Sequence, residues 1–475
     1  MKKIYLIILV IGSVLYGCTD KFEDYNTDKK NPVEVSGESL FSNAQKELSD
    51  QVNSTNVNQN IWKLWAQYWT ETTYTDESNY NILSRNIPQN VFRYYYRTTL
   101  MDLHRADSLI NAAGAAFGED EAVYKNKLYI IDILEVYSYQ RLVDIFGMVP
   151  YTDALDIDNH IYPKYDTGDF IYADLLNRID EDIAGLDPSQ GSFGSADIYY
   201  GGDVAEWLKF ANTLKVKLGI SIADYDDAMA KTAVESAADG GFTSNADDCL
   251  MTYLQASPNY SPLYADLVAS GRHDFVPANT IVDIMNDLED PRRGAYFTPL
   301  NGAYLGGTYA ASNSYTSYSH IADAIHAPDF KGILMTYSEL QFYLAEAAAR
   351  GYNVPGTAEE YYNEGIRASF EFWGTPAADT YLAKPEVAYA AGDWKQKIGT
   401  QSWLASYTRG LVGYTSWRRL DYPILNPPED MDYDEIPVRF TFPVNEQTLN
   451  KDNRDAAAEA IGGDELTTKV FWDRY

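Results

Sequence analysis

Residues 337–373 limit the possible folds more than any other stretch, because they encode a helix, a short turn and a second helix. Apolar residues recur there at the three- and four-residue intervals that line one face of a helix. The first helix is expected to stop at Gly351, after which Pro355-Gly356 turns the chain. Thr357 then begins the second helix, and Glu360 completes a capping box.

The same pattern recurs earlier in the chain. Helical spacing of apolar residues predicts four more helices, over 96–110, 124–145, 172–186 and 207–218. Asp203 and Glu206 supply a capping box for the last of these. Repeated helical pairs with alanine at the close contacts are typical of stacked tetratricopeptide repeats. The sequence therefore predicts a mainly α fold built from tetratricopeptide-like helical pairs.

A loop-rich insertion from about residue 241 to 332 interrupts the helical pattern. It is rich in proline, glycine, serine and asparagine, yet it also carries many aromatic residues, which disordered segments usually lack. We therefore expect ordered loops that present rings to a ligand, although the same rings are equally consistent with contact to a partner protein. The candidate ligand-binding residues here are Tyr296, Tyr304, Tyr309, Tyr315 and Tyr318.

An earlier aromatic segment divides into core and surface candidates. Trp65 and Trp69 share a helix face with Ile61, which favours the core over a binding site. Tyr74 and Tyr80 lie among threonine, aspartate, serine and asparagine. We expect them to be exposed loop rings, and they complete the set of candidate ligand-binding residues.

The amino end has the pattern of a lipoprotein signal. Lys2 and Lys3 precede an apolar run of about a dozen residues, too short to span a bilayer. Gly17 and Cys18 follow, and Cys18 is the expected lipidation site. Residues 1–17 are then a signal peptide, 18–40 a lipidated flexible stalk and 41–475 one helical body. An ordinary cleaved signal is the alternative, but it does not require a cysteine here.

Charge and cysteine content exclude several classes of protein. The formal net charge of the 475 residues is −32, so nucleic acid and anionic lipid surfaces would repel the body. If Cys18 is acylated, Cys249 has no partner, and no disulfide holds the fold together. We expect Cys249 to be a small buried apolar residue.

No motif for catalysis, cofactor or metal binding is present. The sequence has no nucleophile elbow, zinc-protease motif or phosphate loop, and its five histidines are scattered. The acidic stretches 224–227 and 287–290 lack the ligand spacing of a calcium loop, so we interpret them as solvated surface. Arg418 and Arg419 are expected to form structural ion pairs with carboxylates, and Trp417 to be packed. We predict no enzyme activity, although the many carboxylates leave a glycosidase pair possible.

Five motifs in order resemble the SusD/RagB family of outer-membrane nutrient-binding lipoproteins, and the match is closest to its SusD-like branch. They are residues 139–150 (YQRLVDIFGMVP), 337–347 (YSELQFYLAEA), 361–369 (YYNEGIRAS), 417–423 (WRRLDYP) and 437–446 (PVRFTFPVNE). The resemblance implies a helical tetratricopeptide-like body with long irregular loop insertions and a few short strands. Acidic residues after Cys18 also resemble the export signal of Bacteroidetes surface lipoproteins, although attachment facing the periplasm stays open.

The resemblance also implies a function. Members bind an oligomeric nutrient, most often a glycan, and act as the lid of a SusC-like TonB-dependent barrel without chemistry on the ligand. We therefore expect a protein that a lipid anchors to the outer membrane at the cell surface and that takes up glycans. Three alternatives stay open, namely a peptide-binding receptor of the same kind, a surface glycoside hydrolase and an adhesin.

Overall fold

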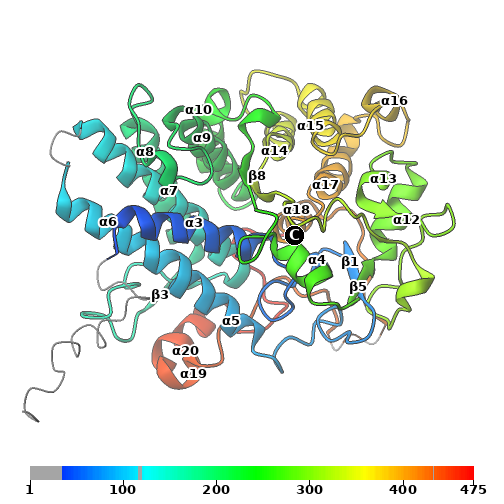
Figure 1. Cartoon of the computed structure of the whole chain (residues 1–475), viewed down its shortest axis with the longest axis horizontal. Helices are drawn as coiled ribbons and strands as arrows, with labels where there is room; N and C mark the ends of the chain where they lie inside the picture. The colour runs from blue at the N-terminus through cyan, green and yellow to red at the C-terminus, as the bar shows by residue number, and fades with distance from the viewer. Residues whose placement is uncertain (1–34, 116–119, 430, 432) are drawn as a thin grey trace, which may run out of the picture.

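The structure, a computed structural model, describes residues 35–115, 120–429, 431 and 433–475. The expected signal peptide, Cys18 and the stalk up to residue 34 lie outside the described residues. Helices dominate the described part, and they stand largely antiparallel to their neighbours in sequence (Figure 1). No helix in this part is long and apolar enough to cross a membrane.

The helical pairs predicted from the sequence are present. The region 96–110 forms the π-helical turn η1 (Tyr95–Leu100) and α6 (Met101–Ala113). The other helices of this body are α3 (Gly37–Asn53), α5 (Ile87–Tyr94), α7 (Glu121–Phe146), α8 (Gly168–Gly185), α9 (Val204–Ser221), α10 (Asp227–Ala237), α14 (Tyr337–Ala349), α15 (Ala358–Phe372), α17 (Trp394–Ala405) and α18 (Gly410–Leu420). The mainly α fold is thus confirmed.

Of the two predicted capping boxes, only the one at α15 is complete; Asp203 caps α9, but its own backbone N–H donates to Tyr200 O and not to Glu206. Asp203 accepts hydrogen bonds from the backbone N–H groups of Ala205, at 2.9 Å, and Glu206, at 3.4 Å. Before α15, Glu360 N–H donates to Thr357 Oγ1 at 3.2 Å, and Thr357 N–H donates to Glu360 Oε2 at 2.8 Å. Reciprocal bonds of this kind satisfy donors that a helix start would otherwise leave free.

Short antiparallel strand pairs tie distant parts of the chain together. They are β1 (Trp69–Glu71) with β5 (Phe275–Pro277), β2 (Val149–Pro150) with β3 (Tyr165–Asp166), β4 (Cys249–Met251) with β8 (Gly332–Met335), and β6 (Phe297–Thr298) with β7 (His320–Ile321). The insertion 241–332 contains four of these strands, β4 to β7, and β8 begins at its end. The insertion is therefore ordered by pairing with the helical body and with itself.

Short helices fill the remaining connections. They are α4 (Trp62–Trp65), α11 (Pro262–Tyr264), the π-helical turn η5 (Ala265–Ala269), α12 (Asn279–Asp287), α13 (Arg293–Tyr296), α16 (Ala378–Leu382), α19 (Glu446–Leu449) and α20 (Lys451–Ala460). The four of these that come from the insertion, α11, η5, α12 and α13, fall within residues 262–296. Figure 1 shows α12 and α13 beside β1 and β5 at one end of the molecule, away from α6 and α8.

Several side chains predicted to be structural are in the core. Trp65 and Trp69 are fully buried, although Trp69 lies in strand β1 and not on the helix of Trp65, and Cys249 is buried without a disulfide. Trp417 is partly buried against the same core. Arg419 donates to Glu346 Oε2 at 2.5 Å, as expected of a structural ion pair. These predictions are confirmed.

Three charged residues differ from the prediction. Arg418 donates to the main-chain carbonyls of Asp144, at 2.7 Å, and Val438, at 2.6 Å, where we expected a carboxylate partner. Asp290 is completely buried and pairs with Arg292 at 2.6 Å, and Asp224 pairs with Arg350 at 2.7 Å. The interpretation of these two aspartates as solvated surface is wrong, because each forms an ion pair with an arginine. Arg292 follows Asp290 closely in sequence, whereas Arg350 lies far from Asp224 along the chain.

Candidate ligand-binding cleft

The pairing of β1 with β5 brings two polar loops to the same edge. Beyond the last strand pair, Thr72 N–H donates to Asp274 O at 2.8 Å, and Thr72 Oγ1 donates to His273 O at 2.8 Å. The loop that follows β1 carries Tyr74, and the loop that precedes β5 carries Arg272. Antiparallel pairing therefore places these two side chains beside each other, although about two hundred residues separate them in sequence.

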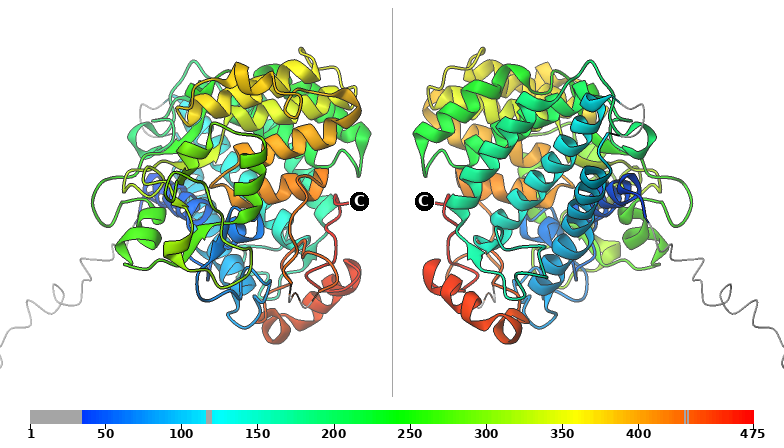
Figure 2. Two further views of the ribbon diagram at one scale, coloured as in Figure 1. Left: turned by 90° about the vertical axis from the view of Figure 1, so that its right-hand side faces the viewer. Right: turned by 90° about the vertical axis from the view of Figure 1, so that its left-hand side faces the viewer.

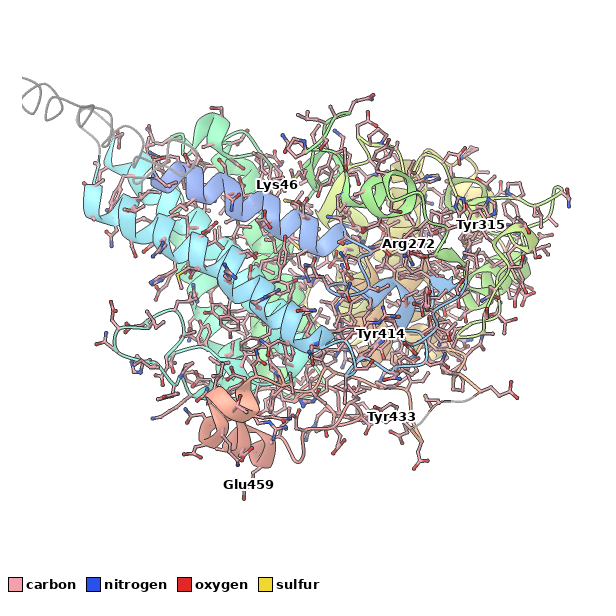
Figure 3. The ribbon with its side chains drawn as sticks, turned by 60° about the horizontal axis from the view of Figure 1, so that its bottom comes forward. Lys46, Arg272, Tyr315, Tyr414, Tyr433 and Glu459 are labelled. Carbon is pink, nitrogen blue, oxygen red and sulfur yellow. The ribbon has the colours of Figure 1, made fainter. Side chains whose placement is uncertain are left out.

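These loops form one wall of a hollow of about 470 Å³, which we call the cleft. Its size lies within the range of pockets that hold small ligands. The Tyr74 ring is 63% exposed and offers a flat apolar face. The other lining residues include Thr55, Asn56, Val57 and Asn58, which follow α3, together with Arg85, Asp266, Ser270, Arg272 and Asp274. Figure 3 shows Arg272 on this surface, with Tyr315 nearby.

Both arginines that line the cleft are paired with carboxylates. Arg272 donates to Asp274 twice, from Nε to Oδ2 at 2.5 Å and from Nη2 to Oδ1 at 2.9 Å. Arg85 pairs with Glu77 at 2.6 Å. Burial raises the pKa of Asp266, which accepts a hydrogen bond from Thr55 N–H at 3.3 Å. Since neither arginine lacks a carboxylate partner, the cleft suits a neutral polar ligand better than an anion.

An aromatic stack stands next to the cleft. The Tyr315 ring lies between His273, at a centroid distance of 4.3 Å, and His320, at 3.9 Å, and both imidazoles are nearly parallel to it. Tyr315 and His273 line a small hollow that shares Arg272 and Asp274 with the cleft. The two imidazoles cover both faces of the Tyr315 ring, so the stack holds this ring in place beside the polar groups but leaves neither face for a sugar.

Two buried titratable groups hold the ends of the segments that line the cleft, Lys63 at α3 and Glu71 at β1. Lys63 Nζ donates to the carbonyls of Asn53, at 3.0 Å, and Ser54, at 2.8 Å, at the end of α3. Burial lowers the pKa of Lys63 to about 7. Burial, together with a hydrogen bond to Glu77, raises the pKa of Glu71 to about 9, so this carboxyl keeps its proton at neutral pH.

Glu71 also shapes the loop that carries Tyr74. Its Oε2 atom accepts from Ser78 N–H at 3.1 Å and from Ser78 Oγ at 2.8 Å. The loop is therefore fastened at both ends, by β1 at one side and by Ser78 at the other. Tyr74 projects from a fixed support, which lowers the entropy cost of binding a ligand.

The other predicted ligand-binding rings separate into two groups. Tyr304 and Tyr318 are half-buried, and the Arg293 guanidinium lies 5.3 Å from the Tyr304 ring centre. Neither lines the cleft. The remaining three, Tyr80, Tyr296 and Tyr309, are buried.

The burial of these three rings has local causes. Tyr80 packs edge-on against Trp65 at 5.3 Å, so our expectation of an exposed ring there is wrong. Tyr296 stacks on Tyr407 at 4.2 Å and donates to Leu404 O at 2.9 Å. Tyr309 packs with the small side chains of Ala278 and Ala310. These rings fill the core beneath the loops, whereas Tyr74 keeps an exposed ring in the cleft.

Sequence patterns missed the polar half of the cleft. Arg272 and Asp274 stand in the exposed run Gly-Arg-His-Asp directly before a buried strand, and that charge-rich boundary was the available signal. Asn56 and Asn58 carry no such signal, since only the end of α3 brings them to the cleft. Within the described ranges, no three histidine, cysteine, aspartate or glutamate side chains are arranged to hold a metal ion.

Comparison with known proteins agrees with the fold. Residues 29–443 match the profile of the SusD-like family, described as starch-binding associating with outer membrane. No curated protein matches the sequence.

Three solved structures illustrate the likeness. A chitin-binding protein is 28% identical, with a TM-score of 0.81, over 93% of this chain and 100% of that one. A SusD homologue from Bacteroides uniformis is 25% identical, with a TM-score of 0.79, over 92% and 99%. A chitin-binding SusD homologue from Flavobacterium johnsoniae is 24% identical, with a TM-score of 0.76, over 92% and 97%.

Proposed function

The chain belongs to the SusD-like family, and on that premise we propose that it is a glycan-binding lipoprotein of the outer membrane. The observation that supports this most is the cleft, where the exposed Tyr74 ring stands beside Arg272, Asp274 and the amides of Asn56 and Asn58. Sugars combine apolar C–H faces with hydroxyl groups. A ring flanked by fixed donors and acceptors matches both features.

The proposed ligand is a neutral oligosaccharide. Both arginines of the cleft already have carboxylate partners, so little free positive charge remains to attract an anionic polymer. The neighbour at 28% identity is a chitin-binding protein, which makes chito-oligosaccharides the first ligands to test. Starch fragments come next, because the family description names starch.

We propose that the protein delivers this ligand and does not cleave it. Attachment through Cys18 would hold the body at the cell surface, where it would close over a SusC-like TonB-dependent barrel. If the protein is purified from intact membranes of cells that express both partners, copurification of the barrel supports this role. Purification of the protein without a large barrel overturns it.

One experiment separates the candidate functions. The full chain, purified in detergent, is titrated by calorimetry with chitohexaose, maltohexaose and a peptide pool, and the sugars are then analysed by chromatography. Saturable binding of a sugar that is recovered intact supports the proposal. Binding of peptides alone favours the peptide receptor, shortened sugars favour a hydrolase, and no binding of any of these ligands favours an adhesin.

The anchor has its own test. Mass spectrometry of native protein is expected to find lipid on Cys18 and no residues 1–17. A bare thiol with the leader still attached contradicts membrane anchoring. That result would leave glycan binding by the cleft in place.

A further inference from the structure

The helices α5, η1 and α6 form one continuous rod. The residues at the two joints, Tyr95 and Leu100, keep right-handed helical backbone angles, so the helical backbone runs unbroken from Ile87 to Ala113. Helix α3 packs along one side of this rod. In Figure 3 the rod runs beside α3, the helix that carries the Lys46 label, and it lies at the surface of the molecule. Figure 2 shows the same helices from the side. One side of the rod is therefore open to solvent.

The open side of the rod carries a basic ridge, which we define as Arg93, Arg97, His104 and Arg105. These four are the exposed residues between Ile87 and Arg105, and the others in this stretch are buried or half-buried. Spacings of four, eleven and twelve residues place them on one face of a helix. The chain has 69 acidic residues against 37 lysines and arginines, yet this face presents no exposed carboxylate. The ridge therefore has the opposite charge to the body as a whole.

The arginines of the ridge have no partner of their own. Within the residues that the structure describes, their side chains form no ion pair and no hydrogen bond. The carboxylate that acts on Arg105 is Asp102, which is half-buried and accepts a hydrogen bond from Asn43 Nδ2 at 2.7 Å. Exposed arginines elsewhere, such as Arg272 and Arg367, pair with aspartates. Since arginines four residues apart on a helix repel each other, an anionic partner would stabilise this face.

The proposed lipid tether would reach the body near the end of the same rod. Helix α3 starts at Gly37, where an added Cβ atom would lie 2.6 Å from Ile110 Cγ1 of α6. Ile110 follows Arg105 by only five residues, or about 8 Å along a helix. Cys18 precedes Val35, the first described residue, by about 17 residues, which can span at most about 60 Å. An anchored body therefore stays close to the membrane, with the ridge near its point of attachment.

We propose that the basic ridge turns toward the membrane that holds the anchor and contacts the phosphate groups of its lipid headgroups. A net charge of −32 repels the body as a whole from an anionic surface, so a tethered body orients with a basic face toward that surface. An acidic protein would offer the same charge, but the position of the tether favours the membrane. The inference rests on the proposed anchoring through Cys18 and adds the orientation of the anchored body.

The test uses the full lipidated chain in vesicles. The chain is reconstituted in phosphatidylcholine alone and in a mixture with anionic phosphatidylglycerol, and the modification of each arginine by phenylglyoxal is followed by mass spectrometry. We expect the three ridge arginines to react at least about threefold more slowly in the anionic vesicles, and high salt to remove this protection. The control is the exposed Arg367 on α15, which Figure 1 places far from the rod and which should react equally in both.

Flotation of the vesicles separates this proposal from the anchor. If the chain floats with both kinds of vesicle and the ridge arginines react equally in both, the ridge proposal is overturned and the anchor stands. Protection that extends equally to Arg367 also overturns it, because the body would then adsorb without a preferred orientation. So does protection that requires an added SusC-like barrel, which would indicate a protein partner. A chain that floats with neither kind overturns the anchor and the ridge proposal together.

A double variant locates the contact. Arg93→Gln combined with Arg97→Gln should make Arg105 react equally in both kinds of vesicle, because most of the attraction is lost. The matched control, Arg367→Gln, should leave Arg105 protected. Both proteins change only exposed side chains, so each should keep the parent melting temperature and the parent oligosaccharide affinity of the cleft. Protection of Arg105 that survives the double variant contradicts the ridge as the contact.

Discussion

Arg272 holds Asp274 by two nearly parallel hydrogen bonds, of 2.5 Å and 2.9 Å, on the wall of the cleft. The pair is half-exposed, so it adds little to stability, and its value lies in fixing the direction of two polar groups. A guanidinium has five donors, and those not used by Asp274 remain for a ligand hydroxyl.

Replacing Arg272 with glutamine should therefore weaken oligosaccharide binding by about tenfold while leaving the unfolding free energy within about 0.5 kcal/mol of the parent. Calorimetry and urea unfolding measure the two effects. The control is Arg367→Gln, which alters another exposed arginine, paired with Asp379 far from the cleft. Equal loss of affinity in both variants would contradict a direct role for Arg272.

The Asp290–Arg292 ion pair should matter for stability in a way that Arg272–Asp274 does not. Both side chains are 0% exposed, and Arg292 also donates to Ser369 Oγ at 3.0 Å. Arg292→Met should lower the unfolding free energy by about 3–5 kcal/mol, because it leaves a buried carboxylate without its partner. Urea unfolding checks this, with Arg367→Met as the exposed counterpart. A cost below about 1 kcal/mol would show that water reaches Asp290.

Lys63 predicts a pH dependence of stability. Burial lowers its pKa from 10.5 to about 7 in the folded chain. Between these values the unfolded chain binds a proton that the folded chain has released, so the contribution of Lys63 to the unfolding free energy rises with pH, by up to about 1.4 kcal/mol per unit. The difference between the parent and Lys63→Met, measured by urea unfolding from pH 7 to 10, should rise accordingly. A constant difference would mean that Lys63 stays charged in the fold.

Gly410 should not tolerate a side chain. A Cβ atom there would lie 2.3 Å from the backbone of Trp62 and Lys63, which cannot move aside as the end of a flexible side chain can. Gly410→Ala should cost at least about 1–3 kcal/mol of unfolding free energy through overpacking. Gly392→Ala is the control, since a Cβ atom at that position meets nothing within 4 Å. Similar melting temperatures for the two variants would contradict the close approach of α18 to α4.

The helical pairs were predictable from the sequence because local spacing and caps determine them. Thr357 and Glu360 satisfy each other within one turn, so their role is encoded within a few residues. The cleft was only half predictable. Tyr74 and Tyr315 were found as rings in polar loops, but Tyr80 and Tyr296 have the same local sequence character and are buried.

Long-range packing accounts for that difference. Tyr296 is buried by Tyr407, which lies more than one hundred residues later, and no local pattern records such a contact. Arg272 and Asp274 could not be predicted from the local sequence for the same reason, since only the β1–β5 pairing sets them beside Tyr74. The buried Asp290 shows that net charge alone does not place an acidic residue at the surface.

The most direct test of the central claim is calorimetric titration of the full chain with chitohexaose, and with maltohexaose if the first does not bind. The parent is compared with Tyr74→Ala and with Tyr162→Ala, whose ring is equally exposed, at 66%, but lies outside the cleft. The account predicts that Tyr74→Ala lowers the affinity by at least about tenfold, or about 1.4 kcal/mol, and that Tyr162→Ala matches the parent. Equal affinity in all three proteins, or no binding of either sugar by the parent, would contradict glycan capture in the cleft.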